Sequence, residues 1–306
     1  MPTTAKPMTY ATGLALVLSA GVLWSVMGLG VRLIGNASAF QILFYRSLGV
    51  LPCLVLLLAW TSGGHPLRAL GRARWASILG GLGLVAAFMG SIIGFKNTTV
   101  ANASFLFATT PLHAAVLGRL ILGEPVRPAT WAAILIAGFG ISLMVYDGIS
   151  LGQFYGNAAA LMSAVGFACF TIALRWEPSG DSLPATFFGG LYTCIASGAI
   201  VVFSGDSLMI SGPDASIAFG LGFIVLSGGL TLYTLGSRVI PAAELPLLTL
   251  AEVVLGPIWV FLVIGEQVGR MTLTGGAIVL LGLAGSALAG LWQERRSQTR
   301  TGAVIA

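Results

Sequence analysis

Residues 100–124 read VANASFLFATTPLHAAVLGRLILGE, and residues 241–266 read PAAELPLLTLAEVVLGPIWVFLVIGE. Both stretches begin with small residues, continue as a long apolar run that contains a proline, and end in Gly-Glu. The offset between the two Gly-Glu pairs is 142 residues. The chain is therefore predicted to be a duplication. Earlier positions match at an offset of 143: Trp24 with Phe167, Met27 with Phe170, and Arg32 with Arg175.

The composition indicates the environment of the chain. Of its 306 residues, 57% are hydrophobic and 8% are charged, and the mean hydropathy is +0.96. A soluble domain carries about 25% charged residues, so most of this surface faces something other than water. The net charge is +5, but the basic residues lie between apolar runs, where they act as topology signals. A lipid bilayer is therefore the expected partner, and nucleic acid is not.

Ten apolar segments are long enough to cross a bilayer with a hydrocarbon core about 30 Å thick. Such runs must be helical, because hydrocarbon offers no partner for unpaired backbone groups. We therefore predict an all-α integral membrane protein with ten transmembrane helices. The predicted spans are residues 11–31, 40–60, 76–95, 101–121, 129–146, 154–174, 185–204, 216–237, 242–264 and 272–292.

The distribution of Lys and Arg predicts the orientation of these spans. Cytoplasmic loops carry an excess of basic residues, and a cytoplasmic N-terminus gives eleven on that side against three on the other. Both termini are then cytoplasmic. The three are Arg32, Lys96 and Arg270. The eleven are Lys6, Arg68, Arg72, Arg74, Arg119, Arg127, Arg175, Arg238, Arg295, Arg296 and Arg300.

The duplication and the topology together predict an inverted repeat. Each half contains five spans, an odd number, so the second half enters the membrane in the opposite orientation to the first. This plan is common among secondary transporters. We predict a first five-helix repeat over residues 11–146, an inverted second repeat over 154–292, and cytoplasmic tails at 1–10 and 293–306.

In each half, the Gly-Glu ending is followed by a helix rich in small residues, TWAAILIAGFGISLMV and then TLTGGAIVLLGLAGSAL. Two halves of this pattern resemble the two EamA domains of the drug/metabolite transporter superfamily. The resemblance implies a ten-helix metabolite carrier of the bacterial inner membrane, with substrate in a central cavity between the halves. Within that superfamily the chain resembles amino-acid and metabolite exporters of the YddG type. One departure is that Val253 stands where the first half has Pro111, and the second proline follows at Pro257.

Polar residues inside apolar spans are the first candidates for substrate binding, because they are costly in lipid and usually face the protein interior or water. Asn102, Thr109 and His113 share one face of the predicted fourth helix, since steps of seven and four residues return to nearly the same angle. They form either a polar surface for an amino-acid headgroup or a set of bonds that holds neighbouring helices together.

Glu252 is the sharpest single candidate. It lies deep in the ninth predicted span, where a carboxylate can bind an ammonium group or carry a proton. The structural alternative is an ion pair, with Arg46 as partner, because the burial of that arginine otherwise lacks an explanation. Glu124 and Glu266 are expected to serve turns and interfacial bonds, and Glu244 lies near a span end, where water is close. Lys96 and Arg238, which the repeat matches, are expected to anchor helix ends, and the alternative is that they gate the cavity.

Aromatic residues form a second candidate set: Trp24, Phe170, Tyr233 and Trp259. A cavity lined by such side chains accepts apolar or aromatic substrates, with a few polar contacts for orientation. The alternative is that these rings belong to the core or face lipid, which is the usual role of aromatic residues at helical spacing.

The motifs of ATP hydrolysis and of familiar catalytic centres are not found in the sequence. With only two histidines, a metal site is not expected, and no cofactor is implied. The predicted function is a secondary transporter or exporter of small metabolites, most readily amino acids, working by alternating access. A nucleotide-sugar or drug carrier remains an alternative, as does a membrane-embedded enzyme acting on lipid, although enzyme activity is not our prediction.

Overall fold

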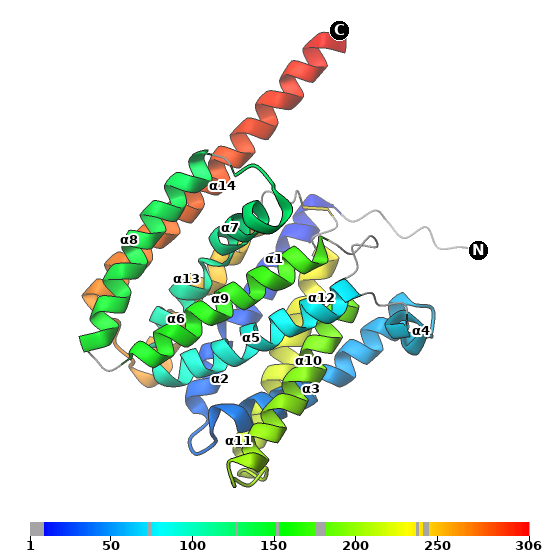
Figure 1. The fold of residues 1–306 in the computed structure, drawn as a ribbon, viewed down its shortest axis with the longest axis vertical. Helices are drawn as coiled ribbons and strands as arrows, with labels where there is room; N and C mark the ends of the chain where they lie inside the picture. The colour runs from blue at the N-terminus through cyan, green and yellow to red at the C-terminus, as the bar shows by residue number, and fades with distance from the viewer. Residues whose placement is uncertain are drawn as a thin grey trace.

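The structure is a computed structural model that describes residues 9–71, 75–126, 128–150, 153–175, 182–236, 239–240 and 245–305. Six residues named above lie outside these ranges: Lys6, Arg72, Arg74, Arg127, Arg238 and Glu244. The described regular structure is entirely helical (Figure 1). The all-α prediction is therefore confirmed.

The first part of the chain contains α1 (Tyr10–Ser25), α2 (Met27–Leu33), α3 (Ala39–Thr61), α4 (Pro66–Gly71), α5 (Trp75–Asn97), α6 (Val100–Phe107), α7 (Thr110–Leu122) and α8 (Pro128–Ser150). The second part contains α9 (Phe154–Leu174), α10 (Leu183–Phe203), α11 (Gly212–Gly220), the π-helical segment η1 (Leu221–Leu226), α12 (Ser227–Gly236), α13 (Leu245–Ile264) and α14 (Arg270–Ile305).

Within the described residues, nine helical segments are long and apolar enough to span a membrane. A shorter apolar helix, Ala251–Ile264, belongs to α13. These segments coincide with the predicted spans to within a few residues at most ends. The chain is a multi-pass membrane protein. The C-terminal helix α14 continues beyond its apolar part to Ile305, through the residues predicted to form a cytoplasmic tail from residue 293.

Several of the long segments are interrupted. The first span is divided at Val26 into α1 and α2, and the fourth is divided between Phe107 and Thr110 into α6 and α7. Pro111 lies in the first turn of α7, where its missing N–H group removes no helical hydrogen bond. The segment between α11 and α12 widens into the π-helical η1, an irregularity that often marks functional sites.

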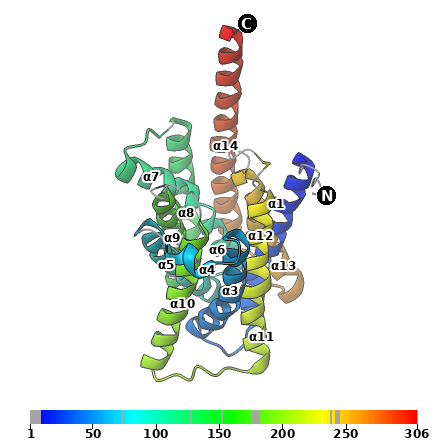
Figure 2. The same ribbon diagram turned by 90° about the vertical axis from the view of Figure 1, so that its right-hand side faces the viewer.

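The helices pack in pairs that recur across the two parts of the chain. α8 and α14 lie side by side along one edge, and α3 packs on α10, as α6 does on α13 (Figures 1 and 2). Contacts between different helices also recur when the two parts of the chain are interchanged. α5 packs on α9, and α12 packs on α1 in the same way. α13 packs on α1, and its equivalents α6 and α7 pack on α9. Helices from the two parts of the chain therefore alternate in space and pack around one common core.

Glycine allows the closest of these contacts. α3 meets α11 and η1 with almost no side chain between them: a Cβ atom on Gly49 would lie 2.3 Å from the Phe219 carbonyl oxygen, and one on Gly222 would lie 1.9 Å from the Arg46 carbonyl oxygen. Small residues of this kind let helix backbones approach in lipid, where dispersion and backbone contacts replace the hydrophobic effect.

Candidate functional site

A small cavity lies between α1, α2, α5, α6 and α13. Its volume is about 30 Å³, enough for water but far below that of a metabolite site. Three of its surrounding elements are irregular nearby, because α1 and α2 meet at Val26, α6 ends at Phe107, and α13 contains Pro257. Transporters built on inverted repeats place substrate sites at such interrupted helices. The lining residues are Trp24, Ser25, Gly28, Phe95, Ser104, Phe107, Glu252, Val253 and Gly256.

Glu252 supplies the carboxylate among these lining residues. It lies one helical turn before Gly256 on α13, and α1 approaches it closely because Gly21 has no side chain: a Cβ there would lie 3.9 Å from the Glu252 amide nitrogen. The described part of the chain contains two ion pairs, and Glu252 belongs to neither. The ion pair with Arg46 that the sequence offered as an alternative is therefore not formed.

Arg46 has a different environment. Its side chain is 2% exposed, and its guanidinium carbon lies 4.6 Å from the centre of the Phe88 ring, a cation–π arrangement. Its Nε and Nη2 atoms are buried without a hydrogen-bond partner among the described residues. The cation is thus held between α3 and α5, outside the residues that line the cavity.

Three of the predicted aromatic residues gather at the cavity. Trp24 lines it, its ring centre lies 5.6 Å from that of Tyr233 on α12, and its indole nitrogen donates to the Leu226 carbonyl oxygen at 3.4 Å. Trp259 on α13 donates to the Ser25 hydroxyl at 2.9 Å. The aromatic set and the carboxylate therefore meet, although they come from the first, eighth and ninth spans.

Thr109 and His113 lie in a second, separate groove of about 280 Å³ between α7, α8 and α9. The imidazole Nδ1 atom of His113 is 3.0 Å from the Thr109 carbonyl oxygen, and the Thr109 hydroxyl donates to the Leu106 carbonyl oxygen at 2.6 Å. The groove is otherwise lined by apolar residues of these helices: Leu112, Val116, Leu117, Ile134, Ala137, Gly138, Ile141 and Val165.

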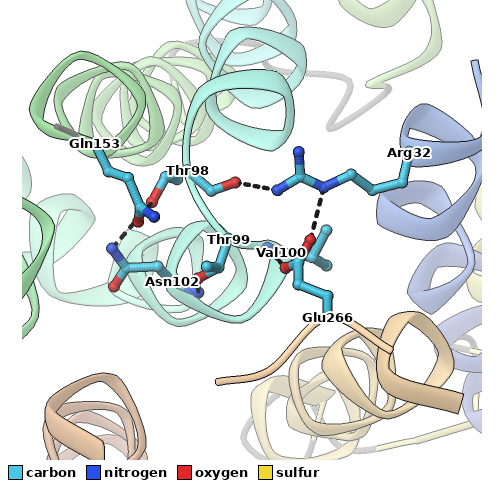
Figure 3. A network of polar contacts seen from close by, with 7 residues as sticks. All are labelled: Arg32, Thr98, Thr99, Val100, Asn102, Gln153 and Glu266. Carbon is cyan, nitrogen blue, oxygen red and sulfur yellow. Dashed lines mark hydrogen bonds and ion pairs between the residues drawn. The ribbon is translucent and has the colours of Figure 1, made fainter. Parts of the chain in front are cut away.

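Asn102 lies apart from both spaces, in a buried polar network that joins α6 to α9 (Figure 3). Its amide nitrogen donates to Thr98 Oγ1 at 3.1 Å and to Asn157 Oδ1 at 2.5 Å. The hydroxyl of Thr98 in turn donates to Gln153 Oε1 at 2.9 Å. The face predicted to be shared by Asn102, Thr109 and His113 is found for Thr109 and His113, which line the same groove. Asn102 lies outside that groove, before the interruption of the helix between Phe107 and Thr110.

Phe170 is also outside the cavity. It is 8% exposed and packs in the contact between α5 and α9, with Leu84, Ala87 and Ala185. Sequence reasoning missed Ser25, Phe95, Ser104 and Phe107 as lining residues. Ser25 and Ser104 each lie within two residues of a named candidate, so small polar neighbours of the candidates were the available signal.

Comparison with known proteins supplies the family. Residues 11–146 match the EamA-like transporter family. This part of the chain is an EamA domain. The chain is also similar to an uncharacterized transporter of Pseudomonas aeruginosa, 26% identical over 284 residues that cover 89% of this chain and 92% of that protein. An uncharacterized transporter of Archaeoglobus fulgidus is 26% identical over 276 residues, covering 88% and 93% of the two chains.

The fold comparison extends beyond the residues that match the family. A protein of known crystal structure superposes with a TM-score of 0.64 and 20% sequence identity, covering 90% of this chain and 98% of that one. The likeness therefore concerns the fold of nearly the whole chain. The family and the relatives point to a membrane transporter of small molecules rather than an enzyme.

Proposed function

We propose that this protein is a secondary transporter of the bacterial inner membrane that exports neutral amino acids, the aromatic ones in particular, by alternating access. The substrate site is the cavity around Glu252 and Trp24, with Tyr233 and Trp259 behind its surface. The observation that carries the proposal is that one carboxylate and several aromatic rings converge at interrupted helices.

The chemistry of the cavity favours this substrate class. A carboxylate in a site lined by aromatic rings suits an ammonium group attached to an apolar body. A nucleotide-sugar would need cationic groups for its phosphates, and the described lining residues include none. Catalysis on lipid would need a cluster of reactive side chains, and the described lining offers one carboxylate and two serines on separate helices.

The packing favours alternating access. In an inverted repeat, equivalent helices of the two halves are expected to pack on each other. The contacts of α3 with α10 and of α8 with α14 are of this kind. Two such halves can rock about a fixed site and expose it to each side in turn. A volume of about 30 Å³ then represents an occluded arrangement, which must open before a metabolite enters.

The test is counterflow of labelled tryptophan and phenylalanine into liposomes that contain the purified protein, with and without a pH gradient. Saturable counterflow is expected for the wild type. Glu252→Gln should reduce it about tenfold or more, because a hydrogen bond to a charged group contributes about 1.5–3 kcal/mol. Asp206→Asn, which removes an exposed carboxylate outside the cavity, is the matched control and should have no effect.

Each result has a defined meaning. Counterflow by Glu252→Gln at the wild-type level would contradict the assignment of the site. The counterflow of His113→Ala, whose residue lines the separate groove, shows whether transport depends on that groove instead of on the cavity. No counterflow of any amino acid would contradict the substrate class. A response of the wild type to the pH gradient that Glu252→Gln lacks would identify this carboxyl group as the proton carrier.

A further inference from the structure

The duplicated sequence places two arginines and two glutamates at equivalent positions. Arg32 corresponds to Arg175, and Glu124 corresponds to Glu266. The structure pairs them crosswise: Arg32 Nε lies 2.8 Å from Glu266 Oε2, and Arg175 Nη1 bonds to Glu124 Oε2. Each ion pair therefore joins an arginine of one predicted half to a glutamate of the other. These are the two ion pairs present among the described residues.

The Arg32 pair lies at one end of the helical bundle. Arg32 is in the last turn of α2. In the loop that follows, Gly35 and Asn36 donate backbone hydrogen bonds to the carboxylate of Asp214 at the start of α11. The loop from α10 to α11 lies opposite the end at which α14 extends to the C-terminus (Figure 2).

The Glu124 pair lies at the other end. Glu124 follows α7, and in the first turn of the next helix, α8, the hydroxyl of Thr130 is hydrogen-bonded to that of Ser286 on α14. The distance between the ends is set by one span: Val100, which contacts Glu266, begins the 23-residue segment that ends just before Glu124. At 1.5 Å per helical residue that segment is at most about 34 Å long, which is enough to cross a bilayer core.

The Arg32 end is the more firmly closed. Besides its bond to Arg32, Glu266 accepts the backbone N–H of Val100 at 2.7 Å, and Arg32 Nη2 donates to the Thr98 carbonyl oxygen at 2.6 Å (Figure 3). The side chains of Arg32 and Glu266 are 25% and 18% exposed, against 51% and 43% for Arg175 and Glu124. An exposed ion pair is screened by water and contributes little, whereas the Arg32 pair is partly shielded.

The same elements connect the Arg32 pair to the cavity. Gly28 and Ser104 line the cavity. Arg32 lies one turn after Gly28 on α2, and Val100 lies one turn before Ser104 on α6. Glu266 follows α13, which carries Glu252. Separating the three helix ends would therefore open the cavity toward the end at which Arg32 lies.

We propose that these two crossed ion pairs are the gates of the transporter, Arg32–Glu266 at one membrane face and Arg175–Glu124 at the other, and that they open in alternation. The proposal rests on the transport function above. Because the sequence is duplicated, each membrane face has one gate, and each gate consists of one arginine and one glutamate. Both ion pairs are formed in the structure, and the Arg32 gate has the additional hydrogen bonds to Thr98 and Val100.

The test measures access to the cavity directly. In a full-length chain with Cys53, Cys169 and Cys194 replaced by alanine, Ser104→Cys places a reporter thiol in the cavity. A membrane-impermeant thiosulfonate is applied to intact spheroplasts or to inside-out vesicles, and the labelling rate is measured from each side. Side-specific labelling does not depend on knowing the transported substrate.

Glu266→Gln is expected to raise the labelling rate about tenfold or more from the face at which Arg32 lies, which the sequence predicts to be external, and to leave the other face unchanged. Glu124→Gln should raise labelling from the opposite face alone, by a smaller factor because that ion pair is more exposed to water. The charge swap, Arg32→Glu with Glu266→Arg, should restore slow labelling. Arg270→Gln, which removes a nearby charge outside the pair, is the control and should match the unmodified reporter chain.

Labelling rates that do not change with Glu266→Gln and Glu124→Gln would overturn the proposal, as would a rise from the wrong face. A rise from both faces together would show loss of packing instead of gating and would also count against it. If the Glu266 variant fails to fold, Arg32→Gln breaks the same pair and is subject to the same criteria. Absence of amino-acid counterflow in the wild type, with the side-specific pattern intact, would contradict only the proposed substrate class.

Discussion

The indole nitrogen of Trp259 donates a hydrogen bond to the hydroxyl oxygen of Ser25, 234 positions earlier in the chain and 2.9 Å away. The same hydroxyl donates to the Val22 carbonyl oxygen at 2.7 Å, so its donor and one acceptor position are both used. The bond ties α13 to α1 at the point where α1 ends, and Ser25 lines the cavity.

Trp259→Phe should therefore weaken both stability and substrate affinity. The free energy of unfolding is expected to fall by about 0.5–1.5 kcal/mol, the net contribution of one hydrogen bond. Thermal unfolding in detergent and the concentration dependence of counterflow measure the two effects. Trp131→Phe, on the exposed surface of α8, is the matched control and should change neither. Equal behaviour of the two variants would contradict the importance of the bond.

Asn102→Leu should destabilise the protein without changing its substrate affinity. The substitution removes the donor to Asn157 Oδ1 inside the α6–α9 contact and leaves a buried acceptor unpaired, at a cost of about 1–3 kcal/mol. Thermal unfolding of Asn102→Leu, Asn157→Leu and the double variant forms a complete cycle. The double variant should be less destabilised than the sum of the singles. Strict additivity would show that the two amides act independently.

Gly222→Ala should be strongly destabilising. The added Cβ atom would lie 1.9 Å from the Arg46 carbonyl oxygen, and because backbone forms the contact, α3 and η1 would have to separate. A loss of about 1–3 kcal/mol is expected in the thermal or denaturant unfolding of the purified protein. Gly220→Ala is the control two residues earlier, since a Cβ there meets no atom within 4 Å. If both variants unfold alike, the close approach is incorrect.

Arg46→Met should stabilise the fold. The guanidinium is buried with two nitrogen atoms unpaired, and replacing a buried charge by an apolar side chain of similar length is often stabilising, by about 1 kcal/mol or more. The methionine sulfur can also pack on the Phe88 ring. Arg46→Lys, which keeps a buried charge, should gain nothing. A lower unfolding temperature for Arg46→Met would show that the charge has a partner in the native protein. Counterflow by this variant would report separately on any role in transport.

The helices themselves could be predicted from the sequence. Long apolar runs in a chain with 8% charged residues permit only membrane helices, because backbone groups must be paired within each segment. Spans such as 154–174 and 40–60 therefore agree with α9 and α3 to within one residue. The continuation of α14 to Ile305 was missed because residues 293–301 are polar or charged, and a search for apolar runs ends where such residues begin.

The candidate site could be predicted in part. Glu252 and Trp24 were named because a carboxylate and a large ring in a span each require an explanation, and both line the cavity. Asn102 and His113 were grouped with each other on the assumption of a continuous helix. The break after Phe107 separates them, and a proline pattern alone does not give the direction in which the chain resumes.

The sequence by itself determined the class of the molecule and the approximate limits of most spans, and it predicts the correspondence of Arg32 with Arg175 and of Glu124 with Glu266. Only the tertiary structure decided that these residues pair crosswise and that Glu252 has no ion-pair partner among the described residues. The physical reason is that the apolar character of a run of residues decides whether that one segment forms a membrane helix, and it carries no information about which other helix the segment contacts. Pairing between helices depends instead on where their interruptions and glycine contacts allow the backbones to meet.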